Sequence, residues 1–161
     1  MTLSIPALLI EAPFPRVLRP VLESLAQLAL RVALAIPFYR SGMTKWDGFL
    51  SLSDSADALF TDEFKLHILG GQYPFPAPHL MAFASGLMEV VLPILLVFGL
   101  GTRLAALGLL GMTAIIQLTE PDGWANFHLI WAASALAIFL HGPGKISLDA
   151  LIVKLLGGRR S

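Results

Sequence analysis

The chain contains no cysteine, and only 14% of its residues are charged. Without cysteine it has no thiolate metal ligand, no Fe–S ligand and no redox dithiol of its own. Any electron or sulfur chemistry therefore requires a bound cofactor or a partner protein. The formal net charge is zero, which gives no electrostatic footprint for binding nucleic acid.

Charge is scarcest between residues 79 and 118, where Glu89 and Arg103 are the only fully charged residues. A helix of about 20 apolar residues spans a bilayer, so this run predicts two spanning helices. Its turn is expected at residues 99–103, where two glycines precede a threonine and an arginine. With 56% hydrophobic residues and a mean hydropathy of +0.75, the chain is expected to be an integral membrane protein.

The apolar segments predict an all-α, four-helix membrane bundle in one domain, residues 25–156. The expected spans are residues 25–43, 80–100, 104–118 and 124–141. Residues 1–24 contain four prolines and no basic cluster ahead of a short apolar run, which predicts an N-terminal arm and no cleaved signal peptide. Residues 157–161 form a basic C-terminal tail.

Two further segments are amphipathic. In the first connection, SADALFTDEFKLHIL places apolar residues at helical spacing and acids on the other face. It predicts a short helix, ending at Gly70-Gly71, that lies on the membrane or caps the bundle. After the fourth span, LDALIVKLL predicts a second amphipathic helix along the membrane surface.

Four spans place both chain ends on the same side of the membrane. Seven basic residues are expected on that side: Arg16, Arg19, Arg103, Lys145, Lys154, Arg159 and Arg160. Only Lys45 and Lys65 lie opposite. Because basic residues accumulate on the cytoplasmic side, this bias predicts cytoplasmic termini in a bacterial inner membrane.

The chain resembles the DoxX family of small membrane proteins over roughly residues 25–156. The matching pieces, in order, are LRVALAIPFYRSGMTK, ALFTDEFK with YPFPAP, GLMEVVLPILLVFGLGTRLAALGL, and GPGKISLD. The resemblance implies a four-helix membrane bundle. It also implies an association with quinone-linked oxidoreduction, with sulfur oxidation or respiratory complexes, with detoxification of quinones and oxidants, and with membrane partners.

Glu89 near the middle of the second span is the main candidate for a catalytic group, because a carboxylate inside a membrane is costly. Small neighbours on its helix face favour a buried, partnered glutamate. We expect an ion pair with Arg31 or Arg40, which can bind a polar head group or take up a proton when a quinol is oxidised. The alternative is a structural pair that fixes helix register. The resemblance carries Arg31, Lys45 and Glu89 over by position, whereas Arg40 is added from this sequence alone.

Polar and aromatic residues near the outer face suggest a second candidate site. They are Lys45, Gln117, Trp124, Asn126, His128 and Trp131. In one interpretation they line a quinone pocket, with the imidazole donating to a carbonyl and an indole stacking on the ring. In the other, the aromatic residues are interfacial anchors.

The histidine spacing gives little support to haem, and no metal site is predicted. A labile metal site formed by His67, His79 and His128 stays open as an alternative, because the sequence does not determine their geometry. We find no phosphate-binding loop, nucleophile elbow or dinucleotide fingerprint.

Three hypotheses of function follow. The first is a quinone-interacting or accessory subunit of an oxidoreductase or stress-response system, with a membrane or periplasmic partner. The second is a proton-coupled carrier of a small solute, with Glu89 as the coupling group. The third is an anchor for a partner protein, without chemistry. A homo-oligomer is compatible with all three.

Overall fold

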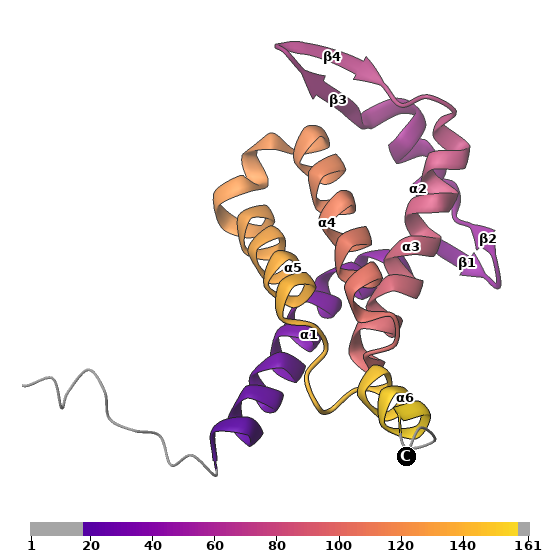
Figure 1. The fold of residues 1–161 in the computed structure, drawn as a ribbon. Helices are drawn as coiled ribbons and strands as arrows, with labels where there is room; N and C mark the ends of the chain where they lie inside the picture. Colours follow the sequence, from indigo (N-terminus) through magenta and orange to yellow (C-terminus); the bar gives the residue numbers. More distant parts are fainter. Residues whose placement is uncertain (1–17, 158–161) are drawn as a thin grey trace, which may run out of the picture.

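Four apolar helices form the membrane bundle in a computed structural model that describes residues 18–157 (Figure 1). Three of them are α1 (Arg19–Met43), α3 (Pro78–Phe98) and α4 (Thr102–Thr119). The fourth span is composite: a 3-10 turn, η3 (Pro121–Gly123), and a π-helical turn, η4 (Trp124–His128), lead into α5 (Leu129–His141). All four spans are long and apolar enough to cross a membrane, which confirms the predicted all-α bundle.

The first span begins earlier than predicted. Helix α1 starts at Arg19, so residues 19–24 extend the helix and do not belong to a loose arm. Pro20 is accommodated because the first turn of a helix does not need its missing N–H. The rest of the predicted arm, residues 1–17, and residues 158–161 of the tail lie outside the described residues.

The bundle core is made of small and branched side chains from all four spans. Its buried members are Leu34, Ala35, Phe38, Leu96, Ala105, Ala106, Leu109, Ala135 and Ile138. Small residues let helix backbones approach closely, which is how helices associate in lipid. This core occupies the half of the bundle nearer α6 (Leu148–Gly157) and the start of α1, which we call the terminal end. The opposite end, which carries the long α1–α3 connection, is called the loop end.

The α1–α3 connection contains more than the single helix predicted for it. A small hairpin, β1 (Trp46–Gly48) with β2 (Ser51–Leu52), precedes α2 (Asp54–Ala58) and a π-helical turn, η2 (Leu59–Glu63). A second antiparallel hairpin follows, β3 (Lys65–Ile68) with β4 (Gly71–Pro74). The predicted helix over residues 55–69 is therefore wrong beyond Glu63.

The second hairpin forms because its sequence alternates at strand period. Lys65, Leu66, His67 and Ile68 alternate polar and apolar side chains, and Lys65 pairs with Pro74 in the ladder. Gly70 does not end a helix; with φ of 82° it makes the hairpin turn beside Leu69.

The α2–η2 segment caps the bundle, which is one of the two placements predicted for it. Phe60 and Phe75 are buried in a second apolar cluster together with Ala82 of α3. This cluster closes the loop end above the spans and, as described below, forms the roof of a cavity.

Candidate functional site

Glu89 is buried at the centre of α3, where only 4% of the residue is exposed. Helix α1 reaches it through Gly42, whose backbone lies so close that an added Cβ would stand 2.8 Å from Cβ of Glu89. Ala82, Gly86 and Pro93 are buried on the same face of α3, which confirms that the glutamate faces the protein interior.

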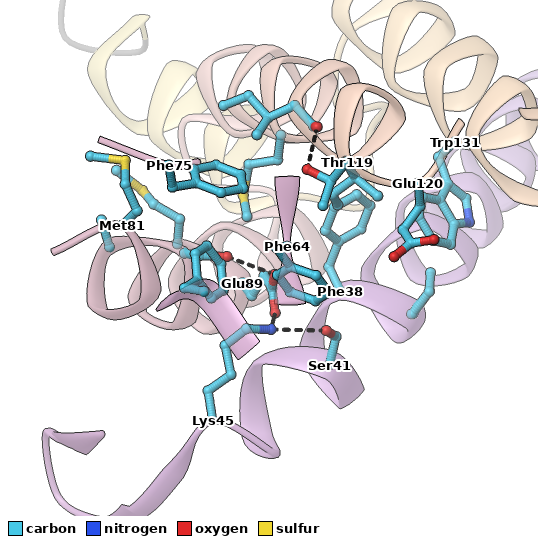
Figure 2. A pocket seen from close by; sticks show the side chains of 18 residues that line it. Phe38, Ser41, Lys45, Phe64, Phe75, Met81, Glu89, Thr119, Glu120 and Trp131 are labelled. Carbon is cyan, nitrogen blue, oxygen red and sulfur yellow. Dashed lines mark hydrogen bonds and ion pairs between the residues drawn. The ribbon is translucent and has the colours of Figure 1, made fainter. Parts of the chain in front are cut away.

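The partner of Glu89 is Lys45, which follows α1 directly. Its Nζ donates to Oε2 of Glu89 at 2.5 Å and to Oγ of Ser41 at 3.1 Å (Figure 2). Oγ of Ser85, one turn before Glu89, donates to Oε1 at 2.9 Å. Both side chains of the ion pair are largely buried, with 11% of Lys45 and 5% of Glu89 exposed. Each carboxylate oxygen therefore has a donor, which a buried charge requires.

The ion pair forms the polar wall of a cavity of about 340 Å³ in the loop-end half of the bundle. Five aromatic side chains from four separate segments of chain and three methionines supply most of the remaining surface, together with isoleucines and Pro37. The lining consists of Pro37, Phe38, Ser41, Lys45, Phe60, Phe64, Phe75, Met81, Ala84, Ser85, Met88, Glu89, Met112, Ile115, Ile116, Thr119, Glu120 and Trp131. Pockets of this volume and polarity are typical of sites for small, mainly apolar ligands.

The cavity has a floor and a roof. Its floor begins where α3 and α4 touch, because Gly108 lets Leu92 approach so closely that an added Cβ would lie 2.8 Å from Cδ1 of Leu92. Its roof is the aromatic cluster of Phe60, Phe64 and Phe75. The roof is tied to α4 because a ring nitrogen of His67 in β3 is hydrogen-bonded to the carbonyl of Leu118 at 3.1 Å.

The predicted pairing of Glu89 with an arginine is wrong. Arg31 is fully buried nearer the terminal end, where it donates to the carbonyls of Leu96 and Val97, each at 3.3 Å, and to that of Ile146. Arg40 is exposed on α1 near the loop end and lines no part of the cavity. Arg31 is excluded by its position along the helix, three turns from Gly42, the point at which α1 meets Glu89. Arg40 lies only two residues from Gly42, which places it on a different, exposed face of α1.

The second predicted site is brought together only in part. Nδ1 of His128 is hydrogen-bonded to Oε1 of Gln117 at 2.7 Å, and its ring lies 5.3 Å from that of Trp131. Trp124 and Asn126 are exposed and do not join this group. They point away because the π-helical turn η4 directs only His128 inward.

Of these residues, Trp131 and Lys45 line the cavity, whereas His128 lies behind Trp131. Trp131 also packs on Phe38 with ring centroids 5.1 Å apart. The imidazole therefore positions the indole that forms one wall.

The three histidines of the alternative metal site have separate partners. His67 contacts Leu118, His79 contacts Asp57 at 2.7 Å, and His128 contacts Gln117. Within residues 18–157 there is no group of three or more metal-ligating side chains close enough to hold an ion.

Comparison with known proteins decides the family. The DoxX family model matches residues 26–120. The chain belongs to the DoxX family. It is also 30% identical, over 141 residues, to an uncharacterised protein of Haemophilus influenzae; the match covers 80% of this chain and 83% of that protein. No solved structure matches the chain.

The DoxX pieces GLGTR and GPGKISLD meet at the terminal end. Asp149 of α6 accepts hydrogen bonds from the backbone N–H of Gly101 at 2.8 Å and of Thr102 at 3.0 Å, and from Oγ1 of Thr102 at 2.8 Å. Burial alone raises the pKa of Asp149, but these hydrogen bonds and the nearby charge of Arg31 together hold that pKa below its ordinary value. Asp149 thus caps α4 from another helix and fixes α6 to the bundle.

Sequence reasoning missed the aromatic roof and the role of Lys45 as the counter-ion. One signal was present: Ser85 and Glu89 are four residues apart and share a helix face, and Ser41 and Lys45 have the same spacing at the end of α1. The roof had no comparable signal, since its three rings come from two segments that meet only in the folded chain.

Proposed function

We propose that this DoxX protein binds a membrane-soluble quinone in the cavity and acts as a quinone-binding subunit of an oxidoreductase or stress-response system. The observation that carries the proposal is the placement of the buried Lys45–Glu89 pair on one wall of a cavity whose remaining lining is mostly aromatic, methionine and aliphatic side chains. A quinone has the matching chemistry, because its ring is flat and apolar and its two carbonyl oxygens accept hydrogen bonds.

The apolar walls account for binding of the ring. Trp131, Phe38 and Phe64 present aromatic surface to the cavity, and Trp131 packs on Phe38. Aromatic pairs contribute about 0.5–1.5 kcal/mol beyond the burial of their area. The methionines adapt to irregular apolar shapes, which suits a ring with several substituents.

The polar wall accounts for orientation and for proton exchange. The Lys45 ammonium has three N–H donors, of which Glu89 and Ser41 engage two, so a third is left for a ligand carbonyl. The Glu89 carboxylate is positioned to accept a proton from a quinol hydroxyl, with Ser85 stabilising the charged form by donating to Oε1. Quinol oxidation releases two electrons and two protons: Glu89 accepts one proton, the second passes to water at the cavity edge where Glu120 is exposed, and the two electrons pass to the oxidoreductase partner, because the chain has no cysteine to accept them.

The charge distribution supports a cytoplasmic location for the terminal end. Within the described residues Arg19, Arg103, Lys145 and Lys154 lie there, whereas the acidic α2–η2 segment lies at the loop end. By the positive-inside rule the chain sits in the bacterial inner membrane with its cavity in the outer half.

Quinone that co-purifies with the protein tests the proposal. Wild type isolated from bacterial membranes in mild detergent is expected to retain quinone, measured by solvent extraction and chromatography. Trp131→Leu and Glu89→Gln are expected to retain about tenfold less, the equivalent of about 1.4 kcal/mol in binding. Trp124→Leu and Arg40→Gln are the matched controls, since both residues are exposed and outside the cavity, and they are expected to retain the wild-type amount. Equal quinone in wild type and Trp131→Leu would overturn the proposal.

A further inference from the structure

The cavity has an exposed apolar margin between α3 and α4. Met88 and Ile115 both line it, yet 47% of Met88 and 51% of Ile115 is exposed. Met88 lies at the midpoint of α3, and Ile115 lies one turn before the end of α4. In a spanning bundle, exposed apolar residues at this depth face lipid.

The helices part at this margin because of where they touch. Near the terminal end α3 and α4 are joined by their short turn and by the contact of Leu92 with Gly108. One turn closer to the loop end, Met88 and Met112 already line the cavity. Figure 1 shows α3 and α4 diverging from their turn toward the loop end.

The other sides of the cavity are closed or polar. The roof of Phe60, Phe64 and Phe75 covers the loop end, and α1 closes the side next to α3 by packing on it at Gly42. The Phe38–Trp131 contact closes the side between α1 and α5. Glu120, exposed at the end of α4, marks a polar margin that faces the aqueous loop end.

We infer that the gap between Met88 and Ile115 is a lateral portal through which the ligand enters from the bilayer and through which its hydrocarbon tail projects. The inference rests on the proposed function for the identity of the ring. It adds the class of ligand, which is an amphiphile with a long apolar tail that enters the cavity from the bilayer and not from water. The arrangement matches such a molecule at both ends, because the Lys45–Glu89 pair receives the polar head while the portal opens at the depth of the acyl chains. A tail leaving through the portal stays in hydrocarbon and never crosses the polar margin, which avoids the cost of exposing it to water.

Cysteine accessibility tests the portal without any quinone, and the absence of native cysteine removes background labelling. Ala84 lines the cavity and tolerates a small change, so Ala84→Cys serves as the reporter in proteoliposomes. The probe is N-(1-pyrenyl)maleimide, which partitions into the bilayer. Adding Met88→Trp or Ile115→Trp places a bulky ring in the portal and is expected to slow labelling about tenfold. Ile130→Trp is the matched control, since Ile130 is 59% exposed on α5 away from the cavity, and it is expected to leave the rate unchanged.

The outcomes separate this inference from the proposed function. Slower labelling with both portal variants, but not with Ile130→Trp, supports a lateral portal whether or not quinone binds. Unchanged labelling with both portal variants would overturn the portal, even where quinone co-purifies. Protection of Ala84→Cys by an added long-chain quinone bears on the ligand alone, so its failure would count against the quinone and not against the portal.

Discussion

Gly42 of α1 lies against Glu89 of α3, with space for hydrogen but not for a methyl group. An added Cβ at Gly42 would stand 2.8 Å from Cβ and 2.9 Å from the carbonyl carbon of Glu89. The second of these neighbours is backbone, so it cannot move aside as the end of a flexible side chain would. The contact therefore sets how closely the two helices approach at the ion pair.

Gly42→Ala is expected to destabilise the bundle by about 1–3 kcal/mol, because the new methyl group forces α1 and α3 apart. Gly111→Ala is the matched control: apart from the neighbouring backbone of its own helix, no atom lies within 4 Å of an added Cβ there. Alanine in place of a helical glycine is favourable by up to about 1 kcal/mol, so the control is expected to be neutral or slightly stabilising. Reversible unfolding by SDS in mixed micelles measures both. Equal stability of Gly42→Ala and wild type would contradict the close contact.

The Lys45–Glu89 pair is expected to show strong coupling. Lys45→Met or Glu89→Leu alone leaves an uncompensated buried charge and is expected to cost about 3–5 kcal/mol. The double variant replaces the pair by two apolar side chains and is expected to be more stable than either single variant. The double-mutant cycle, read by the same unfolding measurement, gives the coupling energy. Additive effects would show that the two residues do not interact in the membrane.

Docking of α6 is expected to depend on pH through Asp149. The pKa of Asp149 in the folded protein lies below the ordinary value of 3.8. The stabilisation that the Asp149 carboxylate gives to the docked α6 is therefore complete above pH 3.8, and it is lost as the pH falls through the pKa of the folded protein. Spin labels at Val153→Cys on α6 and Leu107→Cys on α4 report their separation by double electron–electron resonance. The distance distribution is expected to be narrow at neutral pH and broad in acid.

Asp149→Asn separates this effect from general acid denaturation. The amide cannot supply the charge that the N-terminus of α4 favours, so the distribution is expected to be broad already at neutral pH. Asp122→Asn is the control, since Asp122 is exposed at the loop end. A narrow distribution in Asp149→Asn at neutral pH would show that α6 is held by other contacts.

Labelling of single cysteines in intact cells can test the orientation of the chain in the membrane. Leu69 at the tip of the β3–β4 hairpin is fully exposed, and the proposed topology places it outside the cytoplasm. A membrane-impermeant maleimide is expected to label Leu69→Cys in whole cells, and Lys145→Cys only after lysis. The reverse pattern would place the termini outside and the cavity in the cytoplasmic leaflet.

Much of the fold follows from the sequence because apolar length and charge scarcity determine spanning helices. The helical period of the sequence also predicts that Glu89 shares a face with small residues, and the structure confirms this position. The counter-ion was mispredicted because Arg31 and Arg40 are stronger candidates by composition, whereas the decision depends on where α1 crosses α3. That crossing is a tertiary property set by Gly42.

The hairpins of the connection show a second limit. Residues 55–69 carry apolar side chains at helical spacing. Residues 65–68 within them also alternate polar and apolar side chains at strand period. Pairing with β4 across the Leu69–Gly70 turn and the contact of His67 with Leu118, which is distant in sequence, favour the strand. Leu69 has a φ of 50°, which leucine rarely adopts, so the sequence does not mark it as a turn residue, and Gly70-Gly71 is equally typical of the end of a helix.

Photolabelling with an azido-quinone tests directly whether the cavity beside Lys45 and Glu89 holds a quinone ring. Proteoliposomes would be irradiated with the probe, and the labelled peptides identified by mass spectrometry. We expect label on the cavity-facing parts of α3 and α4, between Met81 and Glu89 and between Met112 and Thr119, and suppression by excess unmodified quinone. Label spread over the lipid-facing surface, or unaffected by competitor, would contradict the account.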